Sequence, residues 1–348
     1  MKTLFAFLLC FCLAAPLPAQ KRKNKKKDEE PKPQVLPVLP DLPEALTAET
    51  GRLTFYVSPL SDKGLLSQQV RDALKALIGS SRGGTIIKLR AFVAGSGDLR
   101  RVREIVTEEF TDRKLSLPIV STLQAGVLPM VGAQVVIEST VADKKVVNPN
   151  GVALFSGIPR KDPAAAVAEL QQAAKRAGVQ EMSSVTCFLS SIADAAVVRG
   201  SLSAAFPGAA LNLIQPQRLG IEQQTNCEGV GRLGTTPPQP VSITKEAALM
   251  NTPRLVFTTV QLVFRDQDSD FQLAVQRLAK TLSTQQVTMK DVVWIGAYSL
   301  TRQNAAKADG ATSGAFDPGH LPASTSLLFE GLPSTDATAA MEVIAARN

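Results

Sequence analysis

Hydrophobic and polar positions change their period twice between residues 151 and 191. The apolar run Val152–Phe155 ends at a Ser-Gly-Ile-Pro turn, which is typical of a short buried strand. Residues 163–177 then carry apolar side chains at helical spacing, with Pro in the first turn and Gly just past the end, the usual asymmetry of helix ends. A β-rich run over residues 184–189 closes the segment. The pattern predicts strand, turn, helix and strand.

The same order of elements is predicted three times along the chain. The first copy has strands at 53–58, 86–93, 119–123 and 135–141 and helices at 68–77 and 98–110, the second of which begins at a candidate cap, Asp98. The second copy has strands at 152–155, 184–189, 211–214 and 223–230 and helices at 163–177 and 194–206. The third copy has strands at 254–259, 291–298, 324–329 and 339–345 and helices at 270–283 and 301–316. A linker is predicted at Pro237–Pro240, between the second and third copies.

Four sequence features recur at matching places in the three copies. An aromatic residue lies six positions before the second helix, and a phenylalanine ends that helix. A hydroxyl residue closes the opening strand, and a glutamate lies in the last strand. In this order the positions are Phe92, Phe188 and Tyr298; Phe110, Phe206 and Phe316; Ser58, Ser156 and Thr259; and Glu138, Glu228 and Glu342. The common register predicts an internal repeat.

Two segments precede the first copy. Residues 1–20 hold a lysine near the start and an apolar run that is shorter than the ~20 residues of a membrane span. We interpret them as a signal peptide and expect a secreted or periplasmic protein with no transmembrane segment after cleavage. Residues 21–50 are rich in Lys and Pro and are predicted to be a disordered linker, a solvated spacer rather than a tether to an anionic surface.

The charge and the side chains with metal affinity exclude several classes of function. Of the net charge of +7, +5 comes from Lys2 and residues 21–35, so the remainder is nearly neutral and nucleic acid is not an expected partner. Because His320 is the only histidine, we expect no zinc site. The glycines of residues 229–234 match a dinucleotide motif, but Thr-Thr-Pro-Pro follows them in place of a helix. No cofactor or metal is predicted.

Two cysteines remain once the signal peptide is removed. Cys187 and Cys227 are either a disulfide, which an exported protein can form, or two small buried hydrophobic residues. Among large aliphatic domains the second alternative is the more common. The sequence alone leaves the pairing open.

Three short motifs resemble the RidA/YjgF family. Residues 155–159 are similar to its strand ending in Ser-Gly-Gln-hydrophobic-Pro, and residues 290–295 are similar to its Asp-Val-Val-Lys strand. Leu128-Pro129 and Leu332-Pro333 are similar to its Leu-Pro…Glu-Ile-Glu ending. The resemblance covers about residues 51–348. It implies an α/β (α+β) chorismate-mutase-like fold in three tandem units, 51–145, 146–235 and 250–348. Because ordinary members are homotrimers with clefts between subunits, it also implies a monomeric intramolecular pseudo-trimer.

The resemblance implies deamination of enamines and imines, but the residues for it are replaced. The family's carboxylate-clamping Arg falls on Val120, on Ala209 or Ala210, and on Ser324, and its catalytic Glu falls on Val136, Asn226 and Ala340. Its cleft Tyr has no counterpart, and Glu138, Glu228 and Glu342 match its structural glutamate. We therefore predict no catalytic residues and a small-molecule ligand in the clefts between units.

The candidate cleft residues are Ser58, Ser156, Thr259, Gln261, Ser324, His320 and Arg218. A hydroxyl residue that closes a strand is more often a turn former than a ligand group. Gln261 is the only match to the family's Gln after that hydroxyl, and Arg218 is a candidate for a displaced cation. Two alternatives stay open: an active deaminase that uses a displaced cationic clamp, and an RNA-binding relative, which the near-neutral remainder and the signal peptide disfavour.

Overall fold

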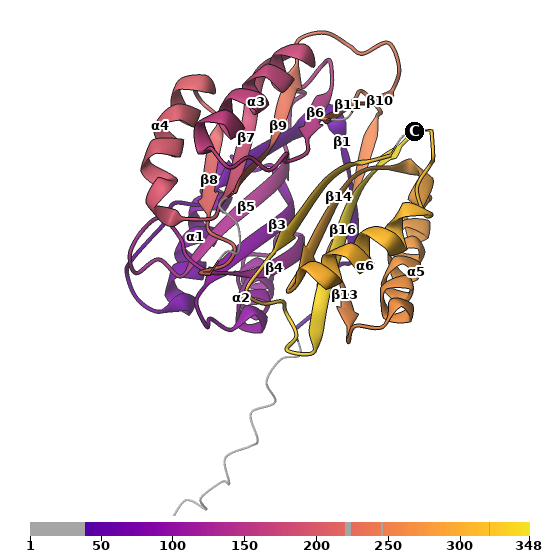
Figure 1. Ribbon diagram of the computed structural model, residues 1–348. Coiled ribbons are helices and arrows are strands. Elements are labelled where there is room, and N and C mark those ends of the chain that lie inside the picture. Colours follow the sequence, from indigo (N-terminus) through magenta and orange to yellow (C-terminus); the bar gives the residue numbers. More distant parts are fainter. Residues whose placement is uncertain (1–38, 220–223, 245, 320) are drawn as a thin grey trace, which may run out of the picture. The chain divides into compact units, whose positions relative to one another are not determined.

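The computed structural model describes residues 39–219, 224–244, 246–319 and 321–348. The predicted signal peptide, residues 21–38 of the predicted linker and His320 lie outside the described residues. Leu39–Asn348 is one compact unit, a mixed α+β structure with three sheets whose helices cover one face of each sheet (Figure 1). The expected fold class is confirmed at this level. None of the helices in the described ranges is long and apolar enough to cross a membrane.

The first sheet has the strand order β2-β5-β3-β4, with β3 and β4 parallel and the other neighbours antiparallel. Its elements are β2 (Leu53–Val57), α1 (Leu66–Ser80), β3 (Thr85–Ala94), α2 (Leu99–Asp112), β4 (Ile119–Ala125) and β5 (Val135–Ala142). The side chain of Asp98 accepts a hydrogen bond from the Arg100 N–H at the start of α2, so the predicted helix cap is confirmed.

The second sheet has the order β10-β11-β6-β9-β7-β8, with β7 and β8 parallel. Its elements are β6 (Val152–Phe155), α3 (Pro163–Arg176), β7 (Val179–Leu189), η2 (Ile192–Asp194), α4 (Ala195–Ala205), β8 (Ala210–Ile214), β9 (Thr225–Leu233), β10 (Val241–Ile243) and β11 (Ala247–Met250). After the predicted linker at Pro237–Pro240 the chain does not pass directly to the third sheet. It first adds the pair β10–β11 to the edge of β6.

The third sheet has the order β1-β12-β16-β14-β15, and β13 also pairs with β16. Its elements are β1 (Ala45–Glu49), η1 (Thr50–Arg52), β12 (Arg254–Thr258), β13 (Gln261–Phe264), α5 (Asp268–Thr284), η3 (Met289–Asp291), β14 (Val292–Ser299), α6 (Arg302–Ser313), β15 (Ala323–Leu328) and β16 (Ala337–Arg347). Here too the last neighbours, β14 and β15, are parallel.

The prediction of a disordered linker over residues 21–50 is wrong for its last part. Residues 45–49 form β1, which pairs antiparallel with β12 from Ala45 opposite Thr258 to Glu49 opposite Arg254. Pairing satisfies an edge of β12 that would otherwise be open. The five prolines of residues 31–43 dominate the composition before this segment, and the strand can be recognised only from its pairing with β12.

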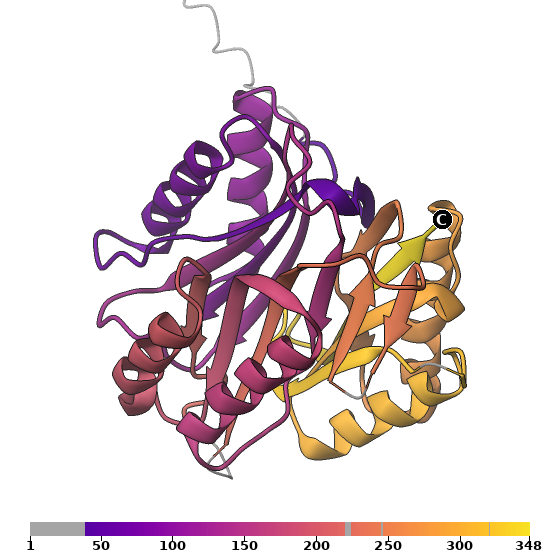
Figure 2. The same ribbon diagram turned by 90° about the horizontal axis from the view of Figure 1, so that it is seen from above.

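The three sheets share a core on their inner faces. In Figure 2 the helices lie outside and the sheets face a common centre. Each sheet packs against its own helices in a separate apolar cluster. Two further clusters draw residues from all three sheets: one includes Ile87, Leu154 and Phe257, and the other includes Phe92 and Phe188. An apolar face that no helix covers is thereby buried against the other sheets.

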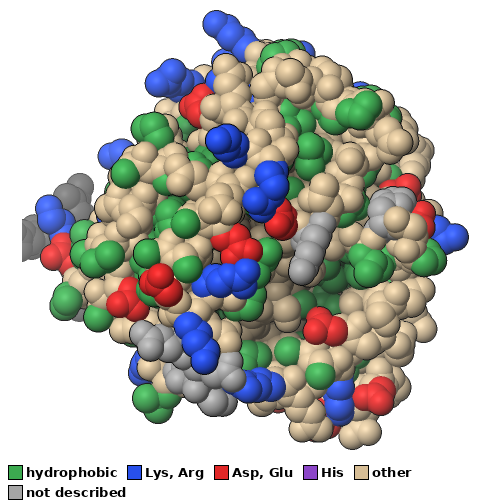
Figure 3. Space-filling view, turned by 45° about the horizontal axis from the view of Figure 1, so that its top comes forward, with side chains coloured by type: hydrophobic (Ala, Val, Ile, Leu, Met, Phe, Trp, Pro, Cys, Tyr) green, Lys and Arg blue, Asp and Glu red, His purple; other side chains and the backbone are tan. Residues whose placement is uncertain are grey.

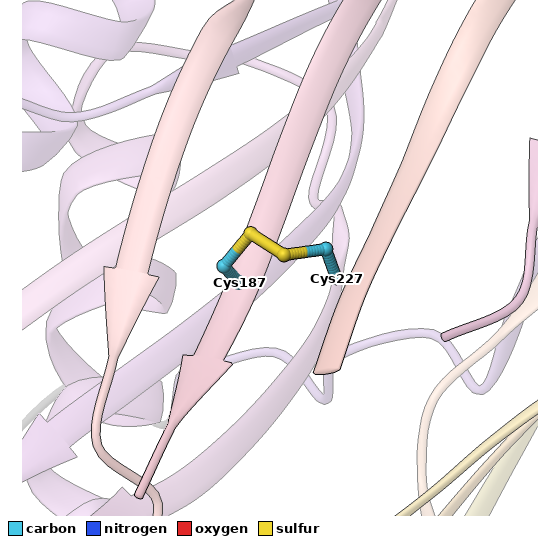
Figure 4. Close-up of a disulfide and its surroundings, with 2 residues drawn as sticks. All are labelled: Cys187 and Cys227. Carbon is cyan, nitrogen blue, oxygen red and sulfur yellow. A yellow bond between two sulfur atoms is a disulfide. The ribbon is translucent and has the colours of Figure 1, made fainter. Parts of the chain in front are cut away.

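Cys187 and Cys227 form a disulfide between the neighbouring strands β7 and β9 (Figure 4). The two residues lie directly opposite each other in the antiparallel pair, and both are buried. The alternative preferred from the sequence, two unpaired buried thiols, is therefore wrong. The two cysteines are 40 positions apart in the sequence, and strand register, which the order of residues does not reveal, brings them together.

Candidate functional site

A row of three inward residues crosses each sheet in the same register. In every sheet a glutamate of the last strand lies opposite a residue of the second strand, which in turn lies beside a residue of the third strand. The rows are Glu138–Arg90–Ser121, Glu228–Thr186–Asn212 and Glu342–Gly296–Thr325. The repeated glutamates found in the sequence thus occupy equivalent positions, and all of the rows lie between the two shared apolar clusters.

Side chains of one sheet bind the glutamate of another. Oε1 of Glu138 accepts hydrogen bonds from the Thr186 hydroxyl at 2.5 Å and from Asn212 Nδ2 at 2.6 Å. Oε2 of Glu342 accepts one from the Ser121 hydroxyl at 2.5 Å. Side chains of the second sheet therefore donate to the glutamate of the first, and a side chain of the first donates to the glutamate of the third. By the same pattern Thr325 of the third sheet would donate to Glu228 of the second.

Two cations from β3 neutralise part of this negative charge. Lys88 Nζ donates to Glu342 Oε2 and to the Thr258 carbonyl, each at 2.9 Å. Arg90 donates from Nε to Glu138 Oε2 at 2.8 Å, and its Nη2 bonds to Glu228 Oε1. We call Lys88, Arg90, Glu138, Glu228, Glu342 and Tyr298 the central polar cluster.

Tyr298 enters the cluster because the third row has a glycine at its middle position. Its hydroxyl donates to Glu342 Oε1 at 2.8 Å and accepts from Arg90 Nη1 at 3.2 Å. A Cβ atom on Gly296 would lie 2.5 Å from this hydroxyl oxygen. The tyrosine therefore fills the space that Arg90 and Thr186 occupy in the other two sheets.

Burial and charge move the pKa values of these groups in opposite directions. Burial raises the pKa of Glu228; Arg90 opposes the shift, and repulsion by Glu138 adds to it. Burial also acts to raise the pKa of Glu342, but attraction by Lys88 and Arg90 outweighs it and the pKa is lowered. Burial lowers the pKa of Lys88 in spite of Glu342.

Glu228 is the incompletely bonded member of the cluster. Only 6% of the residue is exposed, and its Oε2 atom has no hydrogen-bonding partner within the described part of the chain. The Thr325 hydroxyl lies close enough to favour the ionised carboxylate. Its oxygen nevertheless makes no hydrogen bond to any described residue either. The third link of the pattern is therefore open.

A cavity of about 110 Å³ lies beside the cluster. We call it the axial cavity because strands of all three sheets line it. Its polar lining includes Lys88, Arg90, Glu138, Glu228 and Glu342, and its apolar lining includes Phe55, Leu154, Phe155, Val230, Phe257, Trp294 and Ile344. In the other shared apolar cluster, the rings of Phe92, Phe188, Tyr298 and Phe329 pack with centroids 5.5–6.1 Å apart.

A larger cleft of about 570 Å³ lies between the second and third sheets. Its polar lining includes Ser190, Gln217, Gln224, Asn226, Arg302, Asp309, Ser324 and Ser326. Asn226 is only 6% exposed, and its Oδ1 atom has no hydrogen-bonding partner among the residues described. Gly157 lies against it, since a Cβ there would fall 1.4 Å from that oxygen. Burial raises the pKa of Asp309.

Of the candidate residues predicted from the sequence, Ser324 lines this cleft. The three hydroxyls that close the opening strands bond to the backbone. Ser58 accepts from the Ile137 N–H at 2.9 Å, Ser156 donates to the Glu246 carbonyl at 3.2 Å, and Thr259 donates to the Val120 carbonyl at 2.8 Å. These bonds join segments that are 79 to 139 positions apart, so the hydroxyls connect distant strands and loops rather than form local turns.

The other candidates are not brought together with Ser324. Arg218 is exposed, its backbone N–H donates to Glu330 Oε1 at 2.6 Å, and it lines a separate hollow. Gln261 begins β13 opposite Met341. The candidate set therefore does not form one site.

Two residues that the sequence resemblance matches to functional positions of the family do come together. Asn226, matched to the Glu, and Ser324, matched to the Arg, line the same cleft. By contrast Val120, Val136 and Ala340 are buried in apolar clusters, and Ala210 begins β8.

The sequence interpretation missed Lys88 and Arg90. Both lie in the apolar strand β3, two positions apart, so their side chains share one face of the sheet. Charged residues at alternate positions of an otherwise apolar strand indicate a buried ionic site, since they are seldom buried unless paired. Among the described residues no group of three or more His, Cys, Asp or Glu side chains could hold a metal ion.

Solved structures of the RidA/YjgF/UK114 family match parts of this chain. A member of the YjgF/YER057c/UK114 family from Mycobacterium tuberculosis is 18% identical, with 27% of this chain and 79% of that chain covered and a TM-score of 0.25. A YjgF family member from Neisseria meningitidis is 14% identical, covering 33% and 92%, with a TM-score of 0.26. RidA from the Antarctic bacterium Psychrobacter sp. is 13% identical, covering 31% and 86%, with a TM-score of 0.25.

These three structures are similar to part of the chain only. Each covers about a third of the chain, so none describes how the three sheets are combined. No family model matches the sequence. No curated protein matches it.

Proposed function

We propose that the chain consists of three RidA/YjgF-like units, 51–145, 146–235 and 250–348, folded as an intramolecular pseudo-trimer. The β10–β11 pair belongs with the second unit in this scheme. Three sheets with one strand order and three rows in one register support the proposal. The apolar run and lysine of residues 1–20 support export to a secreted or periplasmic location.

We further propose that the cleft between the second and third sheets binds a small neutral molecule with hydrogen-bond donors, and that it does not deaminate imines. The observation that carries this proposal is Asn226, a residue that lines the cleft and whose buried Oδ1 has no described partner. A buried acceptor left unpaired destabilises the protein, and a ligand N–H would satisfy it. The cleft volume of about 570 Å³ is typical of small-molecule sites.

The same two residues argue against family-type catalysis. An asparagine amide does not take up a proton at neutral pH, so Asn226 cannot act as a general base. The Ser324 hydroxyl has one donor, whereas a guanidinium offers two parallel donors to a carboxylate. Without a base and a bidentate clamp, water is neither activated nor positioned at an imine carbon.

The first experiment tests ligand binding by saturation-transfer NMR on the purified chain. The probes are benzamide, benzoate and benzylamine, which have similar size and different charge. We expect benzamide to bind best, and Asn226→Leu to abolish its signal while the exposed-amide control Gln171→Leu keeps it. Equal benzamide binding by Asn226→Leu would contradict the role of this side chain.

The second experiment follows the hydrolysis of 2-iminopropanoate generated in situ. We expect no acceleration by the protein. A deaminase with a displaced clamp remains the second candidate, because Arg302 at the start of α6 lines the same cleft. In that case benzoate would bind better than benzamide, and Arg302→Ala but not Arg218→Ala would remove an observed activity.

RNA binding has less support than either of these functions. On the face seen in Figure 3, Lys and Arg side chains are interspersed with Asp and Glu rather than gathered by sign. Nucleic-acid sites in proteins are usually continuous basic surfaces.

A further inference from the structure

The axial cavity is separate from the cleft that the proposed function uses. The two share no lining residue. The axial cavity has charged groups on one side and aromatic and aliphatic side chains on the others. At about 110 Å³ it exceeds the ~30 Å³ that one water occupies in the liquid. It is therefore large enough for a small organic molecule.

The charged groups at this cavity do not balance. Three carboxylates face two cations, which leaves one negative charge when all five groups are ionised. Glu138 and Glu342 use both of their oxygens in hydrogen bonds. Glu228 uses Oε1 with Arg90, while Oε2 has no described partner. Both the missing charge and the missing donor are thus at Glu228.

A proton on Glu228 would remove the charge, and the neighbouring Thr325 hydroxyl oxygen would accept the new O–H. A bound cation balances the charge in another way, because it leaves Glu228 ionised and paired with Arg90. A ligand ammonium group supplies a positive charge and N–H donors together. Charge-assisted hydrogen bonds of this kind are stronger than neutral ones.

The opposite wall suits the rest of such a ligand. Phe55, Phe257 and Trp294 line the cavity with Leu154 and Ile344. Apolar walls favour a hydrocarbon body, and aromatic faces attract cations. A cavity of about 150 Å³ holds benzene, so about 110 Å³ accommodates roughly four to five non-hydrogen atoms.

We propose that the axial cavity binds a small alkylammonium ion, with its N–H groups facing the Glu228 carboxylate and its hydrocarbon chain against Phe257 and Trp294. This site is independent of the cleft. Glu228 acts in it as an anionic anchor, held in place by Arg90.

The test measures binding of n-butylamine, which is an ammonium ion at pH 7, to the full chain by calorimetry. 1-Butanol has the same number of non-hydrogen atoms without the charge, and butyrate has the opposite charge. We expect butylammonium to bind at least about tenfold more tightly than 1-butanol, since a hydrogen bond to a charged group is worth that ratio or more. Butyrate should not bind. Equal binding of 1-butanol, or no binding of butylammonium, would overturn the proposal.

Variants assign the binding to this cavity. Glu228→Gln keeps the shape of the side chain and should weaken butylammonium binding about tenfold or more. The control Glu181→Gln changes an exposed carboxylate on the same sheet and should leave it unchanged. Val230→Phe fills the cavity and should abolish binding, which keeps the test decisive if Glu228→Gln does not fold. Asn226→Leu in the cleft should have no effect. Unchanged binding by both Glu228→Gln and Val230→Phe would place the ligand elsewhere and refute the proposal.

Discussion

Glu228 and Glu342 occupy the same register position in the second and third sheets, yet their surroundings differ. Glu342 accepts hydrogen bonds on both oxygens, from Lys88, Ser121 and Tyr298. Glu228 accepts on one oxygen only, as far as the described residues show. The pKa of Glu342 is accordingly lowered and that of Glu228 raised. Equivalent positions in one chain need not share an environment, because no symmetry forces the three rows to change together.

The difference has two identifiable sources. Lys88 lies in the first sheet, and of the three glutamates it forms its salt bridge with Glu342, which places its positive charge on one side of the centre. Gly296 in the third sheet lacks the side chain that Thr186 provides in the second. Thr186 binds the glutamate of its neighbouring sheet, and nothing at position 296 does so for Glu228. Glu228 thus lacks a donor at position 296, and the Thr325 hydroxyl does not bond to it either.

Removing the cation should produce the largest effect. Lys88→Met leaves Glu342 buried without its ion-pair partner, and breaking a buried pair in this way costs about 3–5 kcal/mol of unfolding free energy. Urea denaturation measures the loss. The control is Lys75→Met on the exposed face of α1, for which a change within about 0.5 kcal/mol is expected. A loss below about 1 kcal/mol for Lys88→Met would mean that Glu342 simply takes up a proton.

The two glutamates should differ when each becomes glutamine. Glu342→Gln removes the charge that balances Lys88 and should cost about 2 kcal/mol of unfolding free energy. Glu228→Gln relieves repulsion from Glu138 and supplies an amide donor, so its effect should lie within about 1 kcal/mol. The unfolding free energies of both variants, measured side by side, test the contrast. Equal losses would show that the surroundings of the two residues are energetically alike.

Sequence patterns predicted the parts of this site that are local. The three glutamates and the aromatic residues were found by their common register along the chain, and the structure places the glutamates at equivalent positions of the three sheets. Lys88 and Arg90 lie at alternate positions of the otherwise apolar strand β3, a pattern that indicates a buried ionic site. The partners of these cations could not be predicted, because Lys88 bonds to a residue 254 positions away.

The features that failed all depend on which segments meet. β1 is a strand because β12 offers it an edge, and the Cys187–Cys227 disulfide forms because strand register places the residues opposite each other. The cleft likewise joins Asn226 of the second sheet to Ser324 of the third. The sequence shows which residues are polar and which are apolar. Contacts between distant segments determine which of these residues share a site.

The contributions of Glu228 and Glu342 to the unfolding free energy should change with pH in opposite directions. The raised pKa of folded Glu228 means that the folded state binds more protons than the unfolded state between the unfolded value, about 4.3, and the folded value. Its contribution to stability is therefore present at low pH and lost as the pH rises through the folded pKa. Glu342 has a lowered folded pKa, so its contribution is present above about pH 4.3 and lost as the pH falls through the folded value.

The measurement is the unfolding free energy of the wild type, Glu228→Gln and Glu342→Gln from pH 3 to pH 8. Relative to the wild type, Glu228→Gln should gain stability as the pH rises. Over the same range Glu342→Gln should lose stability relative to the wild type. Parallel curves for the two variants would contradict the opposite pKa directions.

Giving the third sheet the residues that the second sheet has at the equivalent positions should supply the missing hydrogen bond to Glu228. Thr186 and Phe188 of the second sheet correspond to Gly296 and Tyr298 of the third, and a Thr at position 296 would donate to Glu228 as Thr186 donates to Glu138. The tyrosine hydroxyl must first be removed, since a Cβ at Gly296 would lie 2.5 Å from it. We therefore expect Gly296→Thr with Tyr298→Phe to be more stable than Tyr298→Phe alone by about 1 kcal/mol, the net value of one hydrogen bond.

The double variant should also bind butylammonium more weakly than Tyr298→Phe, because Oε2 of Glu228 is then occupied. If it is instead less stable than Tyr298→Phe and binds the amine equally well, then the missing side chain at position 296 is not what leaves Glu228 open.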